Sequence, residues 1–388
     1  MSEEKRKRLI GLVVGEVSGD ALGGKLVSAL RARFPQDHLD FIGTGGPALS
    51  AQGMVSLFPL SDIAVMGIVP VLKKLPSLLN RIQQTADALI AAKPDCLIII
   101  DSPDFTHRVA RKVKAALPHL PIINYVSPSV WAWRPGRAKK MRAYIDHVLA
   151  LLPFEPQAHQ RLGGPPCTYV GHPLIERLNE LHPSDIDQQR RDKKPPLVLV
   201  LPGSRRSEIT RLMPIFGETL ARVQTKTQQD FDFVLPAVDH LRHEIETAIT
   251  QWSIKPRLIF GETEKYRAFR QAHAALAASG TVTLELAMAH VPMAVGYRVG
   301  ALEGQIRHFV TVSSVVLANL VIGENVVPER IQAACNATQL ADDLLPLLHD
   351  TPERRRQMQG FERLDHLMAI NDLSPSEKAA DIVARYLP

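Results

Sequence analysis

The chain has 388 residues, 45% of them hydrophobic and 22% charged, which is enough to bury a large core and indicates two globular domains rather than a disordered chain. Its 46 basic and 40 acidic residues give a net charge of +6, which favours an anionic partner: a nucleic acid, an acidic membrane surface or a phosphorylated substrate. Because only 5% of the residues are aromatic, a nucleic acid is the weakest of these three candidates. The chain shows no signal-peptide pattern, no apolar run of the ~18–20 residues that a membrane span needs, and three widely separated cysteines, so we expect a cytoplasmic protein without a disulfide framework.

Short, unbroken apolar runs that end in Gly, Ser or Asp recur along the chain, and helical patterns follow them. Such runs are typical of parallel strands that are buried on both faces. The predicted strands are Arg8–Val14, Cys96–Ile100, Pro121–Val126, Leu197–Leu201, Phe231–Pro236, Arg257–Phe260 and Ala274–Ala278. The predicted fold class is therefore α/β, with two Rossmann-like domains whose parallel sheets face a cleft and bind ligands at the carboxyl ends of their strands.

Charges and prolines concentrate between residues 176 and 196, a composition typical of a domain boundary. We therefore expect an N-terminal domain over residues 1–178, a linker over 179–196, a second Rossmann-like domain over 197–345, and C-terminal helices over 346–388.

The first predicted strand leads into the turn Gly15-Glu-Val-Ser-Gly-Asp20. Glycines permit a tight turn and close approach by a ligand, and Ser18 is a favourable helix N-cap residue. Two acids in this loop, Glu16 and Asp20, indicate a turn that faces a substrate. The alternative is a purely structural turn.

Asp101 directly follows the strand Cys96–Ile100. A carboxylate at the carboxyl end of a strand, beside a cleft, is well placed to act as a general base. The alternative is that Asp101 braces the turn, while Ser102 or Asp104 caps the following helix.

Two further segments of this half combine apolar and basic residues. Trp131 and Trp133 precede a basic run that ends at Arg142, which fits a membrane interface or a sugar platform, or else a packed loop with a solvated helix. The segment Ile63–Arg81 is apolar and then basic, which suits insertion into an anionic interface; a buried helix is the alternative.

Two turns of the second half suit a nucleotide diphosphate. Ser204 and Arg205 follow a buried strand after a glycine, and Gly280 and Thr281 follow another, so that backbone N–H groups and a guanidinium can meet phosphate oxygens. Glu285, just beyond, could accept hydrogen bonds from ribose hydroxyls. Metal ligands are not indicated, because the Asp-x-Asp at 185–187 lies in the charged linker and His240 and His243 fit a solvated helix.

The motifs GEVSGD, AVMGIVPVL, IDSPDF, YVSPSVWAWR, LLPFE, YVGHPL, LPGSR, ASGTVTLE and VVPERIQ occur in this order from residue 11 to beyond 330. Together they resemble the lipid-A-disaccharide synthase family of two-Rossmann (GT-B) glycosyltransferases. The resemblance implies inverting transfer of 2,3-diacylglucosamine from its UDP derivative to 2,3-diacylglucosamine 1-phosphate, giving the β-1,6 lipid A disaccharide 1-phosphate and UDP. It also implies an enzyme without metal or cofactor, peripheral on the cytoplasmic face of the bacterial inner membrane. A homodimer is a further expectation.

Residue roles follow from the resemblance together with the motifs. Asp101 is the expected base, with Glu16 beside it as the second catalytic candidate. The expected substrate-binding residues are Ser18, Gly19, Asp20, Met66 and Gly67 for the sugars, Ser204, Arg205, Gly280 and Thr281 for the diphosphate, Glu285 for the ribose, and Asn319, Glu329 and Gln332 on the donor side. One departure is Ala318, where the family commonly has proline before the asparagine.

Two other classes of protein are open at this stage. The first is a related two-Rossmann enzyme such as a UDP-sugar 2-epimerase, which needs no acyl-binding surface. The second is a non-enzymatic basic protein of the membrane surface, which would bind liposomes but not UDP.

Overall fold

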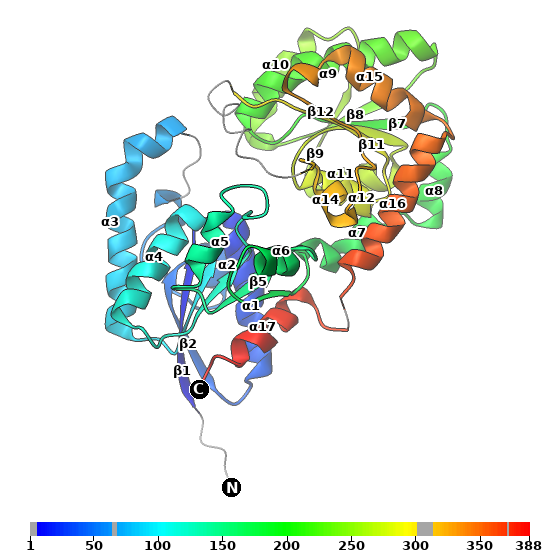
Figure 1. The fold of residues 1–388 in the computed structure, drawn as a ribbon. Coiled ribbons are helices and arrows are strands. Elements are labelled where there is room, and N and C mark those ends of the chain that lie inside the picture. Colours follow the sequence, from blue (N-terminus) through cyan, green and yellow to red (C-terminus); the bar gives the residue numbers. More distant parts are fainter. Residues whose placement is uncertain (1–5, 64–67, 301–312, 371) are drawn as a thin grey trace. The chain divides into compact units, whose positions relative to one another are not determined.

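The computed structural model describes residues 6–63, 68–300, 313–370 and 372–388. The chain forms two compact units (Figure 1): Met1–Pro173 together with Ile370–Pro388, and Leu174–Ala369.

The first unit contains a sheet of six strands in the order β2-β1-β3-β4-β5-β6, and every neighbouring pair is parallel. Helix α1 packs against α17, and α3 packs against α4. The strands are β1 Lys7–Val14, β2 His38–Thr44, β3 Cys96–Ile100, β4 Ile122–Tyr125, β5 His147–Ala150 and β6 Cys167–Tyr169. The helices are α1 Val17–Arg33, α2 Pro47–Ala51, α3 Ile68–Ala92, α4 Pro103–Ala116, α5 Gly136–Met141, α6 Glu155–Arg161 and α17 Pro375–Ala384.

The register of the two central strands places the two predicted motifs of this unit side by side. Val14, the last residue of β1, pairs with Ile100, the last residue of β3. Gly15 and Asp101 therefore leave the sheet at the same edge. A Cβ atom on Gly15 would lie 2.3 Å from the Cβ of Ser102, so only glycine permits this approach.

The second unit has a sheet of six parallel strands in the order β12-β11-β10-β7-β8-β9. Its central strand β10 consists of four alanines and one leucine, AALAA, all buried, and helices α9, α12 and α15 contact it. The strands are β7 Leu197–Leu201, β8 Asp232–Ala237, β9 Arg257–Phe260, β10 Ala274–Ala278, β11 Met293–Tyr297 and β12 Glu329–Ile331. The helices are α7 Leu178–Leu181, α8 Asp185–Arg191, α9 Arg206–Thr227, α10 Arg242–Thr250, α11 Glu262–Gln271, α12 Val282–Met288, α14 Leu317–Ile322, α15 Ala337–Leu344 and α16 Pro352–Met368.

The predicted α/β class with two parallel sheets is confirmed, but the division into units differs from the predicted boundaries at the linker. Residues 179–196 include α7 and α8, which pack on α11. Ser184 and Asp187 form a capping box that starts α8, and the buried Arg191 donates to the backbone carbonyls of Ala289 and His290. The charges that suggested a linker therefore attach this segment to the second unit.

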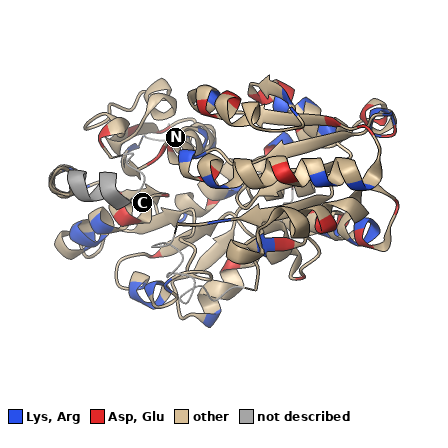
Figure 2. Cartoon of the chain, turned by 90° about the horizontal axis from the view of Figure 1, so that it is seen from above, with Lys and Arg blue, Asp and Glu red and all other residues tan. Residues whose placement is uncertain are grey.

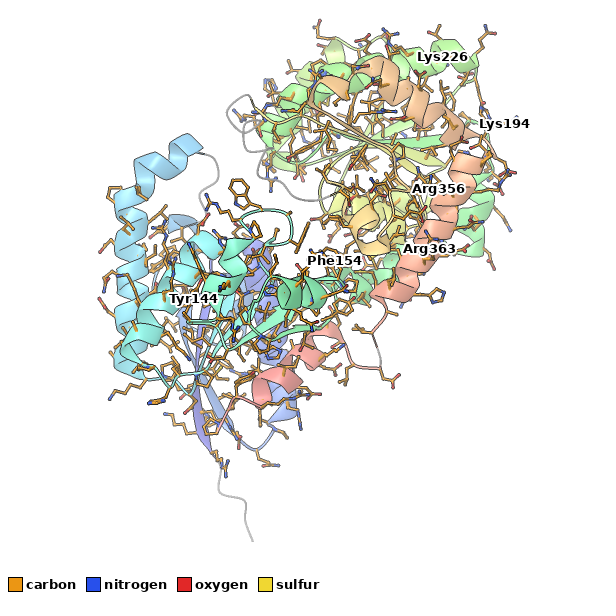
Figure 3. The ribbon with its side chains drawn as sticks, viewed as in Figure 1. Tyr144, Phe154, Lys194, Lys226, Arg356 and Arg363 are labelled. Atoms are coloured by element: carbon orange, nitrogen blue, oxygen red, sulfur yellow. The ribbon has the colours of Figure 1, made fainter. Side chains whose placement is uncertain are left out.

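The C-terminal segment 346–388 is divided between the two units. Helix α16 packs against α12 and α14, and its Arg356 and Arg363 (Figure 3) both bind Glu324. Helix α17 belongs to the first unit, where Asp381 accepts a hydrogen bond from Arg33 at 2.9 Å.

The charged residues lie mainly on helices and loops, while the strands are largely apolar (Figure 2). Among the described helices, none is both long and apolar enough to span a bilayer.

Candidate active site

The turn after β3 holds Asp101 in an unusual backbone conformation. Asp101 and Ser102 have φ values of 55° and 44°, in the left-handed region that residues other than glycine seldom adopt. The hydroxyl of Thr106 donates to the Asp101 carbonyl at 2.7 Å, and the Asp101 amide donates to the Tyr125 carbonyl at 3.1 Å. Backbone strain of this kind is common at functional sites.

The carboxylate of Asp101 keeps acceptor capacity. Its Oδ1 accepts the amide of Ser102 at 2.7 Å, and its Oδ2 accepts the hydroxyl of Ser18 at 3.2 Å. Each oxygen thus has a single partner, which leaves lone pairs for an incoming hydroxyl. Asp101 is half-buried, so a substrate can reach it.

The glycine turn lies against Asp101, and Ser18 is not the helix cap that the sequence suggested. Helix α1 starts at Val17 with Glu16 at its N-cap position, so Ser18 lies in the first turn and its hydroxyl is directed to Asp101 instead. Gly19 is buried, and a Cβ there would lie 3.2 Å from the carbonyl oxygen of Ile100. The structure thus brings Ser18 and Gly19 to the Asp101 turn. Glu16 is half-buried and lines a neighbouring cavity.

Asp20 has a structural role, contrary to the prediction that it faces a sugar. It is buried, and its carboxylate accepts the amides of Gly46 at 2.7 Å, Ala48 at 2.8 Å and Leu49 at 3.2 Å. These are the unpaired amides at the start of α2. Both carboxylate oxygens are therefore occupied by backbone donors.

The tryptophan loop after β4 is anchored from within the first unit. The Trp131 indole donates to the buried Glu155 at 3.1 Å and packs edge-on against Phe154 (Figure 3) with 5.1 Å between ring centroids. Ser127 pairs with the buried His159 at 2.9 Å. Burial raises the pKa of Glu155 to about 7 and lowers that of His159 to about 4. The packed-loop alternative thus describes Trp131.

A cavity of about 760 Å³ lies at the carboxyl ends of β7, β8, β9 and β10 in the second unit. The predicted diphosphate and ribose residues line it together: Ser204, Arg205, Gly280, Thr281 and Glu285. The motifs that the sequence assigned together to a nucleotide diphosphate therefore line one cavity, at the expected edge of a parallel sheet.

The turn after β7 is built around a residue that the sequence analysis did not single out. Glu208 is buried and accepts the amides of Ser204 at 3.0 Å and Arg205 at 3.2 Å. Those two amides are therefore already bonded and do not form the free phosphate cradle that the sequence suggested. Gly203 has a φ of 109°, and a Cβ there would meet the Glu208 carboxylate at 2.3 Å. A glutamate at the third position of a helix, where its carboxylate can accept the amide of the residue before the helix, is the signal that could have found this role of Glu208.

The side chain of Arg205 can still bind an anion, although its backbone amide is bonded to Glu208. Its guanidinium is 61% exposed on the cavity wall and pairs with Glu208 at 3.2 Å. That contact orients the guanidinium but leaves other N–H groups of its fork unused.

Glu285 lies in the same cavity and is paired on both oxygens. Lys265 donates to Oε2 at 2.6 Å and the Tyr266 hydroxyl donates to Oε1 at 3.2 Å. Burial and the Glu285 charge raise the pKa of Tyr266, so Tyr266 stays a donor. Each carboxylate oxygen has a further lone pair, so the arrangement remains compatible with ribose hydroxyls, with Lys265 as an additional cation at the cavity.

The predicted donor-side residues at the end of this sheet mainly brace one another. Asn319 is buried; its oxygen accepts the amides of Val326 and Val327 at 3.1 and 2.9 Å, and its nitrogen donates to the Val327 carbonyl at 2.9 Å. Its side chain is thus bonded within the fold, and its predicted position near the nucleotide stays a prediction. Glu329 accepts the hydroxyl of Ser314 at 2.9 Å.

Gln332 continues the bracing beyond β12. It has a φ of 55°, and its side-chain oxygen accepts the Val299 amide at 3.0 Å. Met66 and Gly67, expected on the sugar side, fall outside the described residues.

One group of potential metal ligands occurs in the described part of the second unit: His182, His290 and Asp365, with ligand atoms within 4.8 Å of one another. His290 and Asp365 already share a hydrogen bond of 2.6 Å. The Asp-x-Asp of the predicted linker is a helix cap, because Asp187 binds Ser184 and Arg270.

Comparison with known proteins identifies the fold and the family. The solved glycotransferase of kitacinnamycin has a TM-score of 0.60 at 16% identity, covering 99% of this chain and 100% of its own. The UDP-GlcNAc 2-epimerase from Neisseria meningitidis, bound to UDP-GlcNAc, has a TM-score of 0.59 at 15% identity, covering 97% of this chain and 98% of its own. These likenesses and the two parallel sheets define the two-Rossmann (GT-B) fold of glycosyltransferases.

Sequence similarity is far higher to one family. Residues 10–383 match the family described as lipid-A-disaccharide synthetase. The lipid-A-disaccharide synthases of Rhodopseudomonas palustris (strain HaA2) and Nitrobacter hamburgensis are 55% and 56% identical, covering 98% and 97% of this chain and 96% and 95% of their own. The chain belongs to the lipid-A-disaccharide synthase family and is a glycosyltransferase; the epimerase alternative is not favoured, because the epimerases share only the fold.

Proposed function

We propose that this chain transfers 2,3-diacylglucosamine from its UDP derivative to the 6-hydroxyl of 2,3-diacylglucosamine 1-phosphate with inversion, releasing UDP. The observation that carries the proposal is the 760 Å³ strand-end cavity, which gathers the Ser204-Arg205 turn, the Gly280-Thr281 turn and Glu285 as a nucleotide-diphosphate site should. The UDP-sugar donor and phosphorylated sugar acceptor agree with membership of the family.

The first unit supplies a base for this displacement. Asp101 stands at the end of a central strand with one oxygen bonded only to the Ser18 hydroxyl. In the proposed reaction it takes the proton of the acceptor hydroxyl as the oxygen attacks the anomeric carbon of the donor. The bond from that carbon to the UDP oxygen breaks, and the electron pair leaves with UDP.

The second unit stabilises the leaving group. Negative charge grows on the diphosphate as the bond breaks, and the exposed Arg205 guanidinium and the Lys265 ammonium at the same cavity are the cations placed to meet it. Gly280, with a φ of 151° and no atom within 4 Å of a built Cβ, leaves open space for a phosphate beside the backbone.

The test is direct: the purified protein is incubated with the two acylated sugars in detergent, and UDP and the disaccharide are measured together. We expect both products in equal amounts, and neither when the acceptor is left out. Formation of a 2-epimer from the UDP-sugar alone would instead assign the epimerase chemistry.

We also propose that the protein is peripheral on the cytoplasmic face of the inner membrane, through the segment Ile63–Arg81. Two leucines of helix α3, Leu75 and Leu79, are 38% and 47% exposed, and an apolar helix face followed by basic residues suits an anionic interface. Val69 and Leu72 precede these leucines in the sequence, and their side chains lie outside the described part of the structure. Replacing both with Ser or Glu should release the protein from anionic vesicles while UDP affinity is kept. Leu367→Ser, an exposed leucine of the second unit, is the matched control. Unchanged sedimentation of the double variant would place the surface elsewhere.

A homodimer is proposed on the family resemblance alone. Light scattering of the purified protein tests it, and a monomer mass across the working concentration range would reject it.

A further inference from the structure

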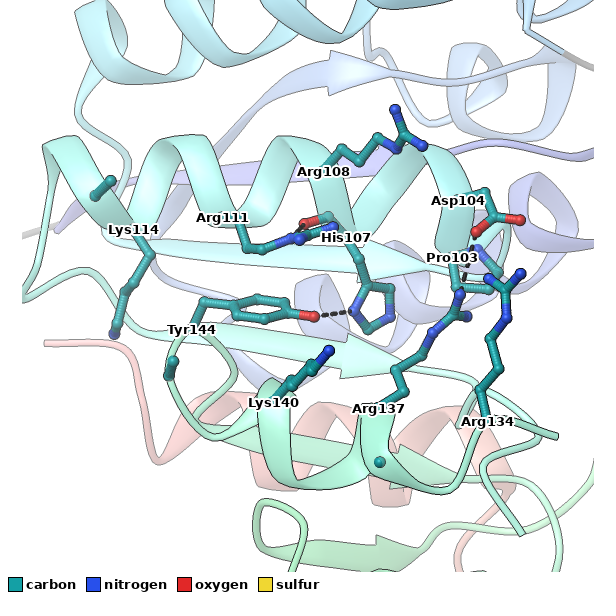
Figure 4. Close-up of a pocket in the computed structure, with 13 residues that line it drawn as sticks. Pro103, Asp104, His107, Arg108, Arg111, Lys114, Arg134, Arg137, Lys140 and Tyr144 are labelled. Carbon is teal, nitrogen blue, oxygen red and sulfur yellow. Dashed lines mark hydrogen bonds and ion pairs between the residues drawn. The ribbon is translucent and has the colours of Figure 1, made fainter. Parts of the chain in front are cut away.

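A second large cavity, of about 860 Å³, lies between α4 and α5 in the first unit (Figure 4). The side chains of Arg134, Arg137 and Lys140 reach from the α5 side toward α4. Six basic residues and one acidic residue line this basic groove: Arg108, Arg111, Lys114, Arg134, Arg137, Lys140 and Asp104.

Internal ion pairs neutralise only part of this charge. Arg137 pairs with Asp104 at 3.2 Å, and Lys114 pairs with Asp146 at 2.9 Å. Within the described residues, the side chains of Arg108, Arg134 and Lys140 make no hydrogen bond or ion pair, although the Arg134 guanidinium lies over the Trp133 ring at 4.8 Å from its centroid. Three exposed cations at one groove repel one another and favour an anion of more than one charge.

The floor of the basic groove is neutral and fixed. His107 is buried and its Nδ1 pairs with the Tyr144 hydroxyl at 3.1 Å, while Arg111 lies over the Tyr144 ring at 5.5 Å from its centroid. Burial, then the charges of Arg137 and Arg111, lower the pKa of His107 to about 3. His107 therefore stays neutral near pH 7 and adds no charge to the groove, whose positive charge comes from its Arg and Lys side chains.

An apolar cavity adjoins the basic groove. It has about 230 Å³, and most of its wall consists of apolar side chains of α3 and α4, including Leu75, Leu78 and Phe105, with Glu16 and Ser102 as polar residues at the end nearer Asp101. The two cavities share Pro103, Asp104 and Arg108. A phosphate site with an apolar pocket at its rim matches an amphiphile that carries both a phosphate and acyl chains.

We propose that the basic groove binds the phosphate of the acylated sugar phosphate that accepts the transferred sugar, with an acyl chain of that acceptor in the adjoining apolar cavity. This inference rests on the proposed function. Arginine forks are suited to phosphate oxygens, and Arg108 stands where the basic and apolar walls meet. Helix α4 begins at Pro103, two residues after Asp101, so an acceptor held by its phosphate and acyl chain stays in the neighbourhood of the base. That position favours the substrate over a membrane lipid as the source of the phosphate.

The test compares Arg108→Ala/Lys140→Ala with Lys139→Ala. Lys139 neighbours Lys140 on α5 and is exposed, but it does not line the groove, so it controls for charge. Activity is measured in neutral detergent micelles without anionic lipid. We expect the acceptor KM of the double variant to rise about tenfold or more, with donor KM and kcat within about twofold of wild type; Lys139→Ala should leave all three unchanged.

A second arm uses the acceptor without its 1-phosphate. The wild type should prefer the phosphorylated acceptor by about tenfold or more, and the double variant should lose most of that preference, because the phosphate no longer finds its cations. A phosphomonoester has a second pKa near ~6, so wild-type acceptor affinity should increase as pH rises from 5 to 7.

Calorimetric titration of the acceptor into protein without donor separates this inference from the proposed function. If no UDP is ever released but the acceptor binds wild type more tightly than the double variant, the function fails and the basic groove stands. Equal acceptor affinity of the two proteins overturns the groove assignment. Reduced sedimentation with anionic vesicles at an unchanged acceptor KM also overturns it and assigns the groove to lipid headgroups. Should the double variant melt early, Arg108→Gln alone gives the same comparison.

Discussion

Asp101→Asn is the substitution that best separates chemistry from folding in this protein. The structure predicts that asparagine fits with little rearrangement. The side-chain oxygen can keep accepting the Ser102 amide, and the new NH2 faces the Ser18 hydroxyl, which can turn and accept. The φ of 55° at Asp101 is also a conformation that asparagine tolerates well.

The cost in folding free energy should therefore stay below about 1 kcal/mol, because no buried donor loses its partner. The effect on the rate should be much larger than this effect on folding. Loss of a general base typically slows a reaction by ~10²–10⁴-fold, which corresponds to about 3–5 kcal/mol in activation free energy. We expect kcat to fall by that factor while the donor KM stays within about twofold.

The assay is UDP release at saturating donor and acceptor, with the melting temperature taken on the same preparation. Asp87→Asn is the control, since Asp87 is an exposed aspartate of α3 that lines neither the basic groove nor the adjoining cavity and accepts a hydrogen bond from Gln83 at 2.7 Å. Near wild-type kcat in a stable Asp101→Asn protein would refute the assignment of Asp101 and make Glu16 the next candidate. Loss of melting temperature without loss of kcat would show that Asp101 only braces its turn.

Four further outcomes are expected. Arg205→Ala should weaken UDP binding about tenfold or more by calorimetry, through loss of a charge-assisted contact, and should barely change the melting temperature because the side chain is 61% exposed. Asp20→Asn should lower the free energy of unfolding by about 1–3 kcal/mol in urea titrations, since an NH2 would face an amide of α2, while kcat per folded molecule is kept. Burial raises the pKa of Glu155 from 4.5 to about 7, so between these pH values the folded protein holds a proton that the unfolded chain releases. The protonated side chain therefore contributes its full stabilisation below pH 4.5, and up to about 3 kcal/mol of it is lost as pH rises through 7. Glu155→Gln should reduce this pH dependence of the melting temperature. Addition of EDTA should leave the rate of UDP release unchanged, and a loss restored by a divalent cation would contradict metal-independent transfer.

The sequence predicted the central strands well because they are continuous apolar runs. β3, β7, β9 and β10 have the predicted bounds, Cys96–Ile100, Leu197–Leu201, Arg257–Phe260 and Ala274–Ala278. Burial on both faces requires such runs, so the pattern is direct evidence of position in the sheet.

The strands that the sequence analysis did not predict lie at or near the sheet edges. β6 and β12 have three residues each, Cys167–Tyr169 and Glu329–Ile331, which is too short for a periodic signal. β2 contains His38 and Asp40, exposed or half-buried at the edge of its sheet. Edge strands need less apolar sequence, so local pattern alone does not reveal them.

The candidate site was predicted at the level of turns but not of individual side chains. The strand-end position of Asp101 and Arg205 follows from where apolar runs stop. Whether a polar residue in such a turn is free or bonded depends on a partner elsewhere in the chain, as with Asp20 and the amides of α2, 26 to 29 residues away. No local pattern carries that information.

The carboxylates of the first unit show why this distinction matters for the chemistry. Asp20 accepts three backbone amides, which hold it in place and occupy both of its oxygens. Asp101 accepts one backbone amide and one hydroxyl, and the hydroxyl can rotate to become an acceptor itself. A base must offer a free lone pair before transfer and keep the proton afterwards. Asp101 can do both at its Oδ2, because the partner of that oxygen is the Ser18 hydroxyl, which can donate to the carboxylate or accept from the carboxylic acid. The backbone hydrogen bond to Oδ1 is kept in both states. The pairing of an acid at a strand end with a serine in the adjacent glycine turn is thus a physical reason for the two motifs to occur in one chain.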